Sequence, residues 1–309
     1  MQKLTIVAPM YNEQEMIPYF FEKINEIVSK INDFNVTILC VNDGSKDETL
    51  NLLKKQRDQQ RNVHIVSFSR NFGHEAAVAA GLKYSDGDAV IIMDADLQDP
   101  PELILDMIKL YHEGYDVVNA KRSDRKKDPW LKRFTAQEFY KVIGSLSGKI
   151  KVPNNVGNYR LMSRRVVDHV NNLTEKNHVF RVQVPYVGFK TTEVEFVRPE
   201  RLKGETHYNY KSMFKLAGDS ITSSSIAPLK WSFKLGIGLG ILSFIAFIVF
   251  LILHYTIYLS SILVVISFIS IWGSLILLAI GIVGEYVGRT LIESQNRPLF
   301  YVDENLEAK

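Results

Sequence analysis

Between Leu235 and Val283 the chain contains no Asp, Glu, Lys or Arg, so every formally charged side chain lies outside this stretch. An α-helix needs ~20 apolar residues to cross a bilayer. Residues 235–253 and 262–283 are both close to that length, and only the short segment 254–261 separates them. A soluble domain of this size rarely holds two such runs without a charge. We therefore predict a two-helix transmembrane hairpin rather than a buried core hairpin.

The two flanks of this stretch are basic. Lys230 and Lys234 precede it, Arg289 and Arg297 follow it, and residues 254–261 contain neither Lys nor Arg. Because basic residues mark the cytoplasmic side of a membrane protein, both ends are predicted to face the cytoplasm. The first apolar run, residues 4–9, is too short for a secretory signal. The prediction is a multi-pass protein of the cell membrane.

These limits divide the chain into a cytoplasmic domain (1–207), a juxtamembrane connector (208–234), the hairpin (235–283) and a cytoplasmic tail (284–309). The net charge of +3 is too small to predict nucleic acid as a partner. The lone cysteine, Cys40, lies in an apolar run and is predicted to be a core residue. Gly236/Gly240 and Gly284/Gly288 have the spacing of helix-packing positions, within the hairpin or between copies of a homo-oligomer.

Short β-rich runs alternate with helical patterns in the N-terminal domain. The predicted strands are residues 4–8, 36–41, 63–68, 89–93 and 117–120, and the predicted helices are 15–31, 47–59, 75–84 and 102–113. This alternation is typical of an α/β domain with a mostly parallel sheet and helices on both faces. After Arg122 it stops. Residues 129–148 form a basic amphipathic pattern, which fits a helix in the membrane interface or one packed on the domain.

Polar clusters follow four of the predicted strands. They are Tyr11-Asn12-Glu13, Asn42-Asp43-Gly44, Arg70-Asn71 and Asp94-Ala95-Asp96. In such sheets ligands bind beyond the carboxyl ends of the strands, so one binding edge is predicted. Asp43 is expected to be free to bind a nucleobase or ribose, since Ser45 and Glu48 have capping-box spacing of their own. Residues 9–13 are expected to frame a base.

Asp94 and Asp96 carry the clearest chemical signal. Both follow a buried strand, and a turn there would let the two carboxylates approach one ion. Hard oxygen ligands suit Mg²⁺ or Mn²⁺, which bridge a diphosphate to a protein, and Gln98 offers a neutral oxygen. Asp99, followed by Pro100 and Pro101, is predicted instead to cap a helix.

Four motifs in this order carry a specific resemblance to a known family. They are Pro-x-Tyr-Asn-Glu from Pro9, Asn-Asp-Gly-Ser-x-Asp from Asn42, Ser-Arg-Asn-Phe-Gly from Ser69, and Asp-Ala-Asp-Leu-Gln-Asp-Pro-Pro-Glu from Asp94. The chain resembles the inverting GT-A glycosyltransferases. More narrowly, it resembles their polyprenyl-phosphate branch, which includes dolichol-phosphate mannose synthase and bactoprenol-phosphate glucosyltransferases. The resemblance extends through the two-span tail.

The resemblance implies a sugar transfer, with inversion, from UDP-glucose or UDP-N-acetylglucosamine to a polyisoprenyl (undecaprenyl) phosphate, for cell-envelope glycan modification. It implies donor contacts from Pro9, Tyr11, Asn12, Glu13, Asp43, Arg70 and Asp94, metal–diphosphate contacts from Asp94, Asp96 and Gln98, acceptor-phosphate contacts from Arg122, Arg133 and Arg201, and a catalytic set of Asp94, Asp96 and Arg160. Arg122 belongs to a basic run, Lys121, Arg122, Arg125, Lys126 and Lys127, which predicts contact with anionic lipid equally well.

The chain departs from the family in two places. Asn158 stands where the family often has Asp, in Gly-Asp-Phe-Arg-Leu, and His207 stands where it often has Lys. A phosphate monoester with a second pKa of ~6 is largely dianionic at neutral pH and needs no base. We therefore predict a base-free transfer, in which the metal and Arg122, Arg133, Arg160 and Arg201 offset the repulsion between acceptor and diphosphate.

Two other functions remain open. A processive polysaccharide synthase would share the donor fold, but its Gln-x-x-Arg-Trp motif is missing, since Arg precedes none of Trp130, Trp231 and Trp272. A non-catalytic membrane module that binds nucleotide sugar is the second. A nucleoside triphosphatase is excluded because the chain has no Gly-x-x-x-x-Gly-Lys-[Ser/Thr] loop.

Overall fold

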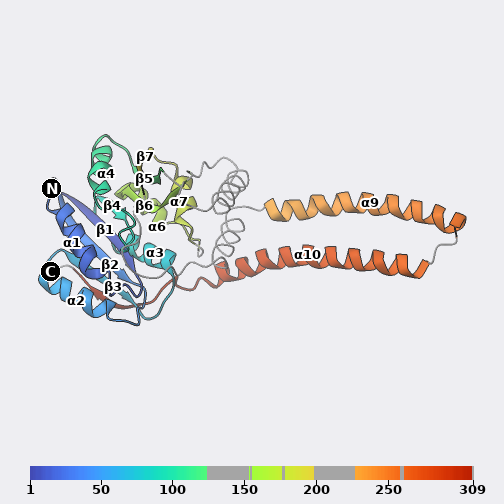
Figure 1. Ribbon diagram of the computed structural model, residues 1–309, viewed down its shortest axis with the longest axis horizontal. Helices are drawn as coiled ribbons and strands as arrows, with labels where there is room; N and C mark the ends of the chain where they lie inside the picture. Colours follow the sequence, from blue (N-terminus) through green and yellow to red (C-terminus); the bar gives the residue numbers. More distant parts are fainter. Residues whose placement is uncertain (124–152, 154, 176–177, 198–226, 258–260, 308–309) are drawn as a thin grey trace. The chain divides into compact units, whose positions relative to one another are not determined.

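The computed structural model describes residues 1–123, 153, 155–175, 178–197, 227–257 and 261–307 (Figure 1). The predicted amphipathic segment 129–148 and most of the connector 208–234 lie outside this range. The chain forms two compact units, one of Met1–Ala217 with Pro298–Lys309 and the other of Gly218–Arg297.

The predicted alternation of strands and helices is confirmed. In order, the structure has β1 (Gln2–Met10), α1 (Ile17–Val28), β2 (Phe34–Asn42), α2 (Thr49–Gln59), β3 (Val63–Phe68), α3 (His74–Tyr84), β4 (Ala89–Ile92), α4 (Leu103–His112) and β5 (Val117–Arg122). The same unit also contains elements that were not predicted: β6 (Val156–Ser163), α6 (Arg164–Asn171), α7 (Phe180–Val187), β7 (Thr191–Phe196) and β8 (Val302–Leu306).

The eight strands form one sheet in the order β7-β5-β6-β4-β1-β2-β3-β8. All neighbours are parallel except where β6 pairs with β4 and β5, and where β8 pairs with β3. In this order β2 lies on one side of β1 and β4 lies on the other. The direction in which successive strands are added to the sheet therefore reverses between β1 and β4. Such a reversal is where ligands bind in open α/β sheets. The loops after β1 and β4 carry two of the four predicted polar clusters.

Apolar side chains cover both faces of the sheet. On one face Ile6 packs with residues of α1, α2 and α4, and on the other face Val7 packs with residues of α3, α6 and α7. This alternation along β1 is the period-two pattern of a strand buried on both sides. Gly81 lets α3 approach closely, because a Cβ there would lie 2.1 Å from Val7 Cγ1.

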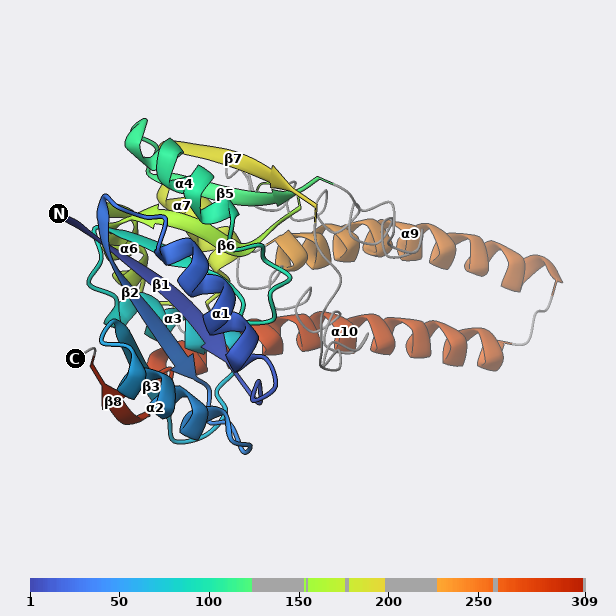
Figure 2. The ribbon, with the colours of Figure 1, turned by 60° about the vertical axis from the view of Figure 1, so that its left-hand side comes forward.

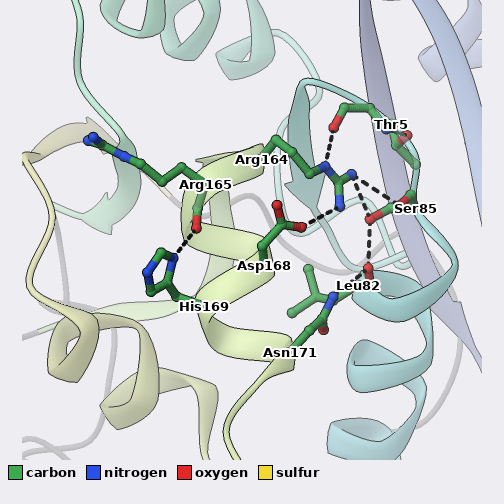
Figure 3. A network of polar contacts seen from close by, with 9 residues as sticks. Thr5, Leu82, Ser85, Arg164, Arg165, Asp168, His169 and Asn171 are labelled. Carbon is green, nitrogen blue, oxygen red and sulfur yellow. Dashed lines mark hydrogen bonds and ion pairs between the residues drawn. The ribbon is translucent and has the colours of Figure 1, made fainter.

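A polar network fixes α6 at the amino-terminal edge of β4, opposite the edge with the polar clusters (Figure 3). The Arg164 guanidinium donates to the carbonyls of Gly87 (2.8 Å) and Ser85 (3.0 Å) and lies 3.5 Å from Asp168. The Gly87 N–H in turn donates to Thr5 Oγ1 at 3.0 Å. These contacts satisfy backbone groups of the turn before β4, so the network is structural.

The second unit consists of two long helices, α9 (Ala227–Ile257) and α10 (Ser261–Gln295), which run antiparallel side by side (Figure 2). The predicted loop at 254–261 is therefore too long: residues 254–257 continue α9, since nothing in His-Tyr-Thr-Ile breaks a helix. Among the residues searched, Ile271–Gln295 is long and apolar enough to cross a membrane, and Gly236–Val249 is a shorter apolar helix. The two-span hairpin stays a prediction.

The end of the chain belongs to the sheet domain. Residues 284–295 of the predicted tail continue α10, whereas β8 pairs antiparallel with β3, with Ile65 opposite Leu306. The predicted boundary at 207 lies outside the described residues, and those at 234 and 283 fall inside α9 and α10.

Candidate active site

Five hydrogen bonds join the loop after β1 to the loop after β2. The Asn12 N–H donates to Ser45 Oγ (2.9 Å), Lys46 N–H to Asn12 Oδ1 (2.9 Å), Glu13 N–H to Thr49 Oγ1 (2.9 Å), Gln14 N–H to Asp47 Oδ2 (3.2 Å) and Glu48 N–H to Gln14 Oε1 (3.1 Å). Asn12 has a positive φ of 53°, which Asn tolerates better than most residues. Its side-chain oxygen accepts from the Lys46 backbone amide. The donor contacts of Pro9, Tyr11, Asn12 and Glu13 stay predictions.

The predicted capping box at Ser45 and Glu48 is wrong. Helix α2 has Glu48 at its N-cap position without a side-chain cap, and Ser45 Oγ accepts from Asn12 instead. The Thr49 N–H donates to Asp47 Oδ1 at 3.1 Å. Sequence spacing missed this because the partner of Ser45 comes from another loop.

Asp43 is buried and is not free, contrary to the prediction. Its carboxylate accepts from Phe72 N (2.6 Å), Gly73 N (2.9 Å) and Asn71 Nδ2 (3.0 Å). Burial raises the pKa of Asp43, and the two backbone hydrogen bonds oppose that shift. Asp43 thus fixes residues 70–73, which we call the donor loop because it contains Arg70, a predicted contact of the sugar donor. The loop passes so close to Gly44 (φ 61°) that a Cβ there would lie 2.2 Å from the carbonyl carbon of Arg70.

Arg70 itself is exposed and packs on its own loop. Its guanidinium lies 3.9 Å from the centroid of the Phe72 ring, and Nη1 donates to the Asn71 carbonyl at 3.0 Å. A direct contact between Arg70 and a donor stays a prediction.

Asp94, Asp96 and Asp99 lie in one tight turn directly after β4. Gln98 N donates to Asp96 Oδ1 at 3.0 Å, Asp94 N donates to Asp99 Oδ2 at 3.2 Å, and Leu97 has a positive φ of 56°. The turn that two carboxylates need to approach one ion is therefore present. Asp96 is buried, whereas Asp94 is partly exposed.

The predicted helix cap at Asp99 is wrong. Helix α4 begins at Leu103, with Glu102 at the N-cap position, and Asp99 is only 4% exposed. Burial and the neighbouring Asp94 raise the pKa of Asp99 to about 7, while Arg122 opposes the shift. Asp99 closes the turn that carries the other two acids.

The donor set fits a hard divalent cation. Within the part of the chain that the structure describes, no three or more His, Cys, Asp or Glu residues are grouped to hold a metal ion. Mg²⁺ commonly takes only one or two protein carboxylates together with substrate phosphates. Asp94 and Asp96 supply such carboxylates, and the amide of Gln98 is close in the chain. The geometry therefore suits a metal that arrives with a diphosphate.

A second cluster, which sequence reasoning missed, lies beside Asp94. His74 Nε2 at the start of α3 lies 3.8 Å from Asp94 Oδ1 and 3.2 Å from Asn158 Nδ2, and Asn158 Nδ2 also donates to Glu75 Oε1 at 3.2 Å. Asn158 comes from β6, which pairs antiparallel with β4 and so begins where β4 ends. The sequence did contain a signal for this cluster. In Gly73-His74-Glu75, two titratable residues stand at the start of a helix, just after the polar residues Arg70 and Asn71 that follow β3.

Arg160, which was predicted to be catalytic and to offset charge at the phosphates, is fully buried and donates to backbone carbonyls. Nη2 donates to the Gly157 carbonyl at 2.6 Å and Nη1 to the Phe180 carbonyl at 3.4 Å, while Nε is buried without a hydrogen-bond partner among the described residues. Burial and nearby Arg181 lower the pKa of Arg160 to about 10, and Glu75 opposes that shift. The side chain orders the strand that carries Asn158, so the geometry favours a positioning role over a contact with substrate.

Tyr159 ties β6 to the acidic turn. It is buried, and its hydroxyl donates to the Pro100 carbonyl at 2.8 Å. Burial raises its pKa further above the usual range. In the Gly-Asp-Phe-Arg-Leu motif that the family often has, Phe stands at the position of Tyr159. A Phe there would lack this hydrogen bond.

Arg122 reaches the same edge. It ends β5, its N–H donates to the Asn155 carbonyl at 3.1 Å, and a Cβ on Gly157 would lie 3.9 Å from its Nη2. Gly157 directly precedes Asn158, so the guanidinium lies beside the strand that carries the second cluster, and its charge opposes the raised pKa of Asp99. Arg133 and Arg201, the other two predicted phosphate ligands, lie outside the described residues.

Comparison with known proteins gives consistent matches. Residues 5–170 match the family model "Glycosyl transferase family 2". The chain is 43% identical over 305 residues to an uncharacterised glycosyltransferase, YkcC, of Bacillus subtilis (strain 168), a match that covers 97% of this chain and 93% of that protein. It is 41% identical to a prophage bactoprenol glucosyl transferase homologue of Escherichia coli (strain K12), with 97% and 98% covered.

A solved structure shares the fold. Glucosyl-3-phosphoglycerate synthase from Mycobacterium tuberculosis, in complex with Mn²⁺, uridine diphosphate and phosphoglyceric acid, aligns with a TM-score of 0.50 and 16% identity. The alignment covers 72% of this chain and 76% of that one. At this identity the match shows the fold alone.

Proposed function

The chain belongs to glycosyl transferase family 2, and from that membership we propose that it transfers a hexose from a UDP-sugar to undecaprenyl phosphate. UDP-glucose is the leading donor, because a relative of nearly the same length is named a bactoprenol glucosyl transferase homologue. UDP-N-acetylglucosamine is the second donor to test. The product would be a lipid-linked sugar for cell-envelope glycans.

The observation that carries the proposal is the pair of acids at the reversal point of the sheet, with Arg122 on the same edge beyond β6. Asp94 and Asp96 lie in the turn after β4, and Arg122 ends β5 on the same edge, hydrogen-bonded to Asn155 and beside Gly157 at the start of β6. A nucleotide diphosphate bound there would share a metal with the acids, and the guanidinium would meet the phosphate of the acceptor. Mg²⁺ or Mn²⁺ would neutralise charge on the leaving diphosphate, and the fold neighbour that contains Mn²⁺ and uridine diphosphate supports this choice.

The charge of the acceptor phosphate determines what the protein has to do for the acceptor. A polyprenyl phosphate is largely dianionic near neutral pH, since its second pKa is ~6. No side chain then has to remove a proton, which agrees with an amide at Asn158. The protein's task is to hold the dianion in line with the anomeric carbon, and Arg122 is the described cation at this edge that we assign to it.

The deciding experiment is product analysis. Membranes containing the chain are incubated with undecaprenyl phosphate and a panel of nucleotide sugars, and lipid products are separated and identified by mass. A single hexose on the prenyl phosphate supports the proposal. Long polymers would favour a processive synthase, and donor binding without any product would favour a non-catalytic module.

Metal dependence is tested with Asp96→Asn. The variant removes one charge from the turn, so we expect transfer to fall at least a hundredfold, as we expect for wild-type protein treated with chelator. Asp106→Asn is the matched control, because Asp106 is exposed on α4 and pairs only with nearby Lys109 in the described contacts. Full transfer by Asp96→Asn, or by chelated wild type, would rule out the metal assignment.

Arg122→Ala tests the acceptor assignment. We expect the KM for undecaprenyl phosphate to rise at least tenfold while UDP binding stays within about twofold of wild type. Arg165→Ala is the control, because Arg165 pairs with Asp116 (2.7 Å) at the opposite edge of the sheet. A parallel loss of donor binding and acceptor use in Arg122→Ala would contradict a role confined to the acceptor.

A further inference from the structure

The C-terminal segment after α10 is anchored firmly at its far end. Beyond the pairing of β8 with β3, Lys54 Nζ lies 2.7 Å from Glu304 Oε1, Arg57 Nε donates to the Glu307 carbonyl at 2.9 Å, and His64 Nε2 lies 2.7 Å from Asn305 Oδ1. These contacts fix residues 302–307 on β3 and α2. They explain how the segment is held, but not what its first residues do.

Those first residues, Phe300 and Tyr301, contact the donor loop and its base. The Tyr301 carbonyl accepts from the Ser69 N–H at 3.1 Å, and the Tyr301 ring lies 6.1 Å from the Phe72 ring. The Phe300 ring stacks on Phe68 with centroids 4.8 Å apart and planes 12° apart. Phe68 meets Phe72 edge-on at 5.7 Å. Four aromatic rings thus connect the end of β3, the donor loop and the C-terminal segment.

The same loop holds the candidate site from its other side. Phe72 N and Gly73 N donate to buried Asp43, and His74, the next residue, starts α3 at 3.8 Å from Asp94. The loop is therefore held between Asp43 and Gly44 on one side and Phe300 and Tyr301 on the other. A shift of the loop would move both the Asp43 carboxylate and His74.

We propose that Phe300 and Tyr301 are positioning residues that hold the donor loop in the geometry that binds the nucleotide sugar. This rests on the proposed function only in that the loop is taken to serve a nucleotide-sugar donor. The segment acts through packing and one backbone hydrogen bond, and it touches neither Asp94 nor Asp96 in the described contacts. Its effect should appear in donor affinity and in the protection of the loop amides, with little effect on the chemical step.

The test uses the full chain in detergent or nanodiscs. Amide hydrogen exchange is measured for peptides covering residues 69–74, together with the KM for UDP-glucose and kcat with undecaprenyl phosphate. In Phe300→Ala/Tyr301→Ala we expect the Phe72 and Gly73 amides to exchange at least tenfold faster and the donor KM to rise at least fivefold, with kcat within twofold. Phe300→Leu/Tyr301→Phe should restore most of the protection.

Lys54→Met is the matched control, because it breaks the ion pair with Glu304 at the anchored end without touching the aromatic contacts. It should leave the exchange of residues 69–74 within twofold of wild type. Tyr301→Ala alone covers the case in which the double variant fails to fold, since Tyr301 is 55% exposed and little buried surface is lost. For that variant we expect at least threefold faster exchange of the same amides.

Unchanged exchange at Phe72 and Gly73 in the folded alanine variants would overturn the proposal, as would a loss confined to kcat. The two proposals fail separately. If the wild-type chain transfers no glucose but the alanine variants still expose the loop amides, the positioning role stands and the assigned donor is wrong.

Discussion

For Asp43, the position at a strand end could be predicted from the sequence, but the hydrogen-bond partners could not. Its place at the end of the second strand was predictable, because a polar residue after an apolar run marks a strand end. Its partners were not, because Asn71, Phe72 and Gly73 come from a different loop, and a sequence pattern does not say which loops touch. The same limit explains Ser45, whose spacing predicted a cap but whose partner, Asn12, comes from another loop. Asp99 was also predicted to cap a helix, but it accepts from the Asp94 N–H within its own turn.

Asn158→Asp tests the second cluster at this scale. The amide donates to Glu75 Oε1 at 3.2 Å, so an Asp would remove that hydrogen bond and place two carboxylates side by side. Like charges at this separation raise the pKa of one acid, and the folded state then binds a proton that the unfolded state releases. Stability is therefore retained below that raised pKa and lost as the pH rises through it.

We expect the melting temperature of Asn158→Asp to fall more at pH 8 than at pH 5, relative to wild type at each pH. The transfer rate should change less than tenfold, since a phosphate acceptor needs no base. Asn158→Ala separates loss of the hydrogen bond from added charge, because it should destabilise the protein equally at both pH values. A hundredfold gain in rate for Asn158→Asp would mean that the reaction does use a base at this position.

At the scale of elements, the first five strands were predictable and β6 was not. β1 to β5 are apolar runs separated by helical patterns, whereas β6 contains Asn158 and Arg160 and reverses direction between β4 and β5. Its polar residues are buried or turned toward the site, so no alternation marks them as a strand. This inserted strand brings Asn158, Tyr159 and Arg160 to the carboxyl end of β4. Because their neighbours there are distant in the sequence, the spacing of motifs along the chain could not predict them.

Tyr159→Phe tests the link between β6 and the turn after β4. The change removes the 2.8 Å hydrogen bond to the Pro100 carbonyl and keeps the ring, which packs edge-on against Phe196. One buried hydrogen bond contributes about 1 kcal/mol, so we expect the free energy of unfolding to fall by about that amount. Transfer should stay within a few fold, because the family often has Phe here. Tyr84→Phe is the control, and equal stability of both variants would show that the Tyr159 bond contributes nothing.

At the scale of the whole molecule, the last strand constrains the path of the chain across a membrane. β8 pairs with β3, so residues 302–306 must lie on the same side of any membrane as the N-terminal sheet domain. A segment that starts and ends on one side crosses an even number of times. If only Ile271–Gln295 spanned the bilayer, β8 would be separated from β3. We therefore expect α9 and α10 to cross together, with both flanks in the cytoplasm as the basic residues predict.

Cysteine labelling tests this topology with little background. Cys40 is the only cysteine, and burial raises the pKa of its thiol to about 12, so it forms almost no reactive thiolate. We place new cysteines by Ile262→Cys at the start of α10 and Asp303→Cys in β8, both at exposed positions. In intact cells a membrane-impermeant maleimide should label position 262 only, and position 303 should react after lysis. Labelling of position 303 in intact cells would contradict a cytoplasmic sheet domain. Equal protection of both positions would mean that neither helix crosses the membrane, because the pairing of β8 with β3 excludes a single crossing.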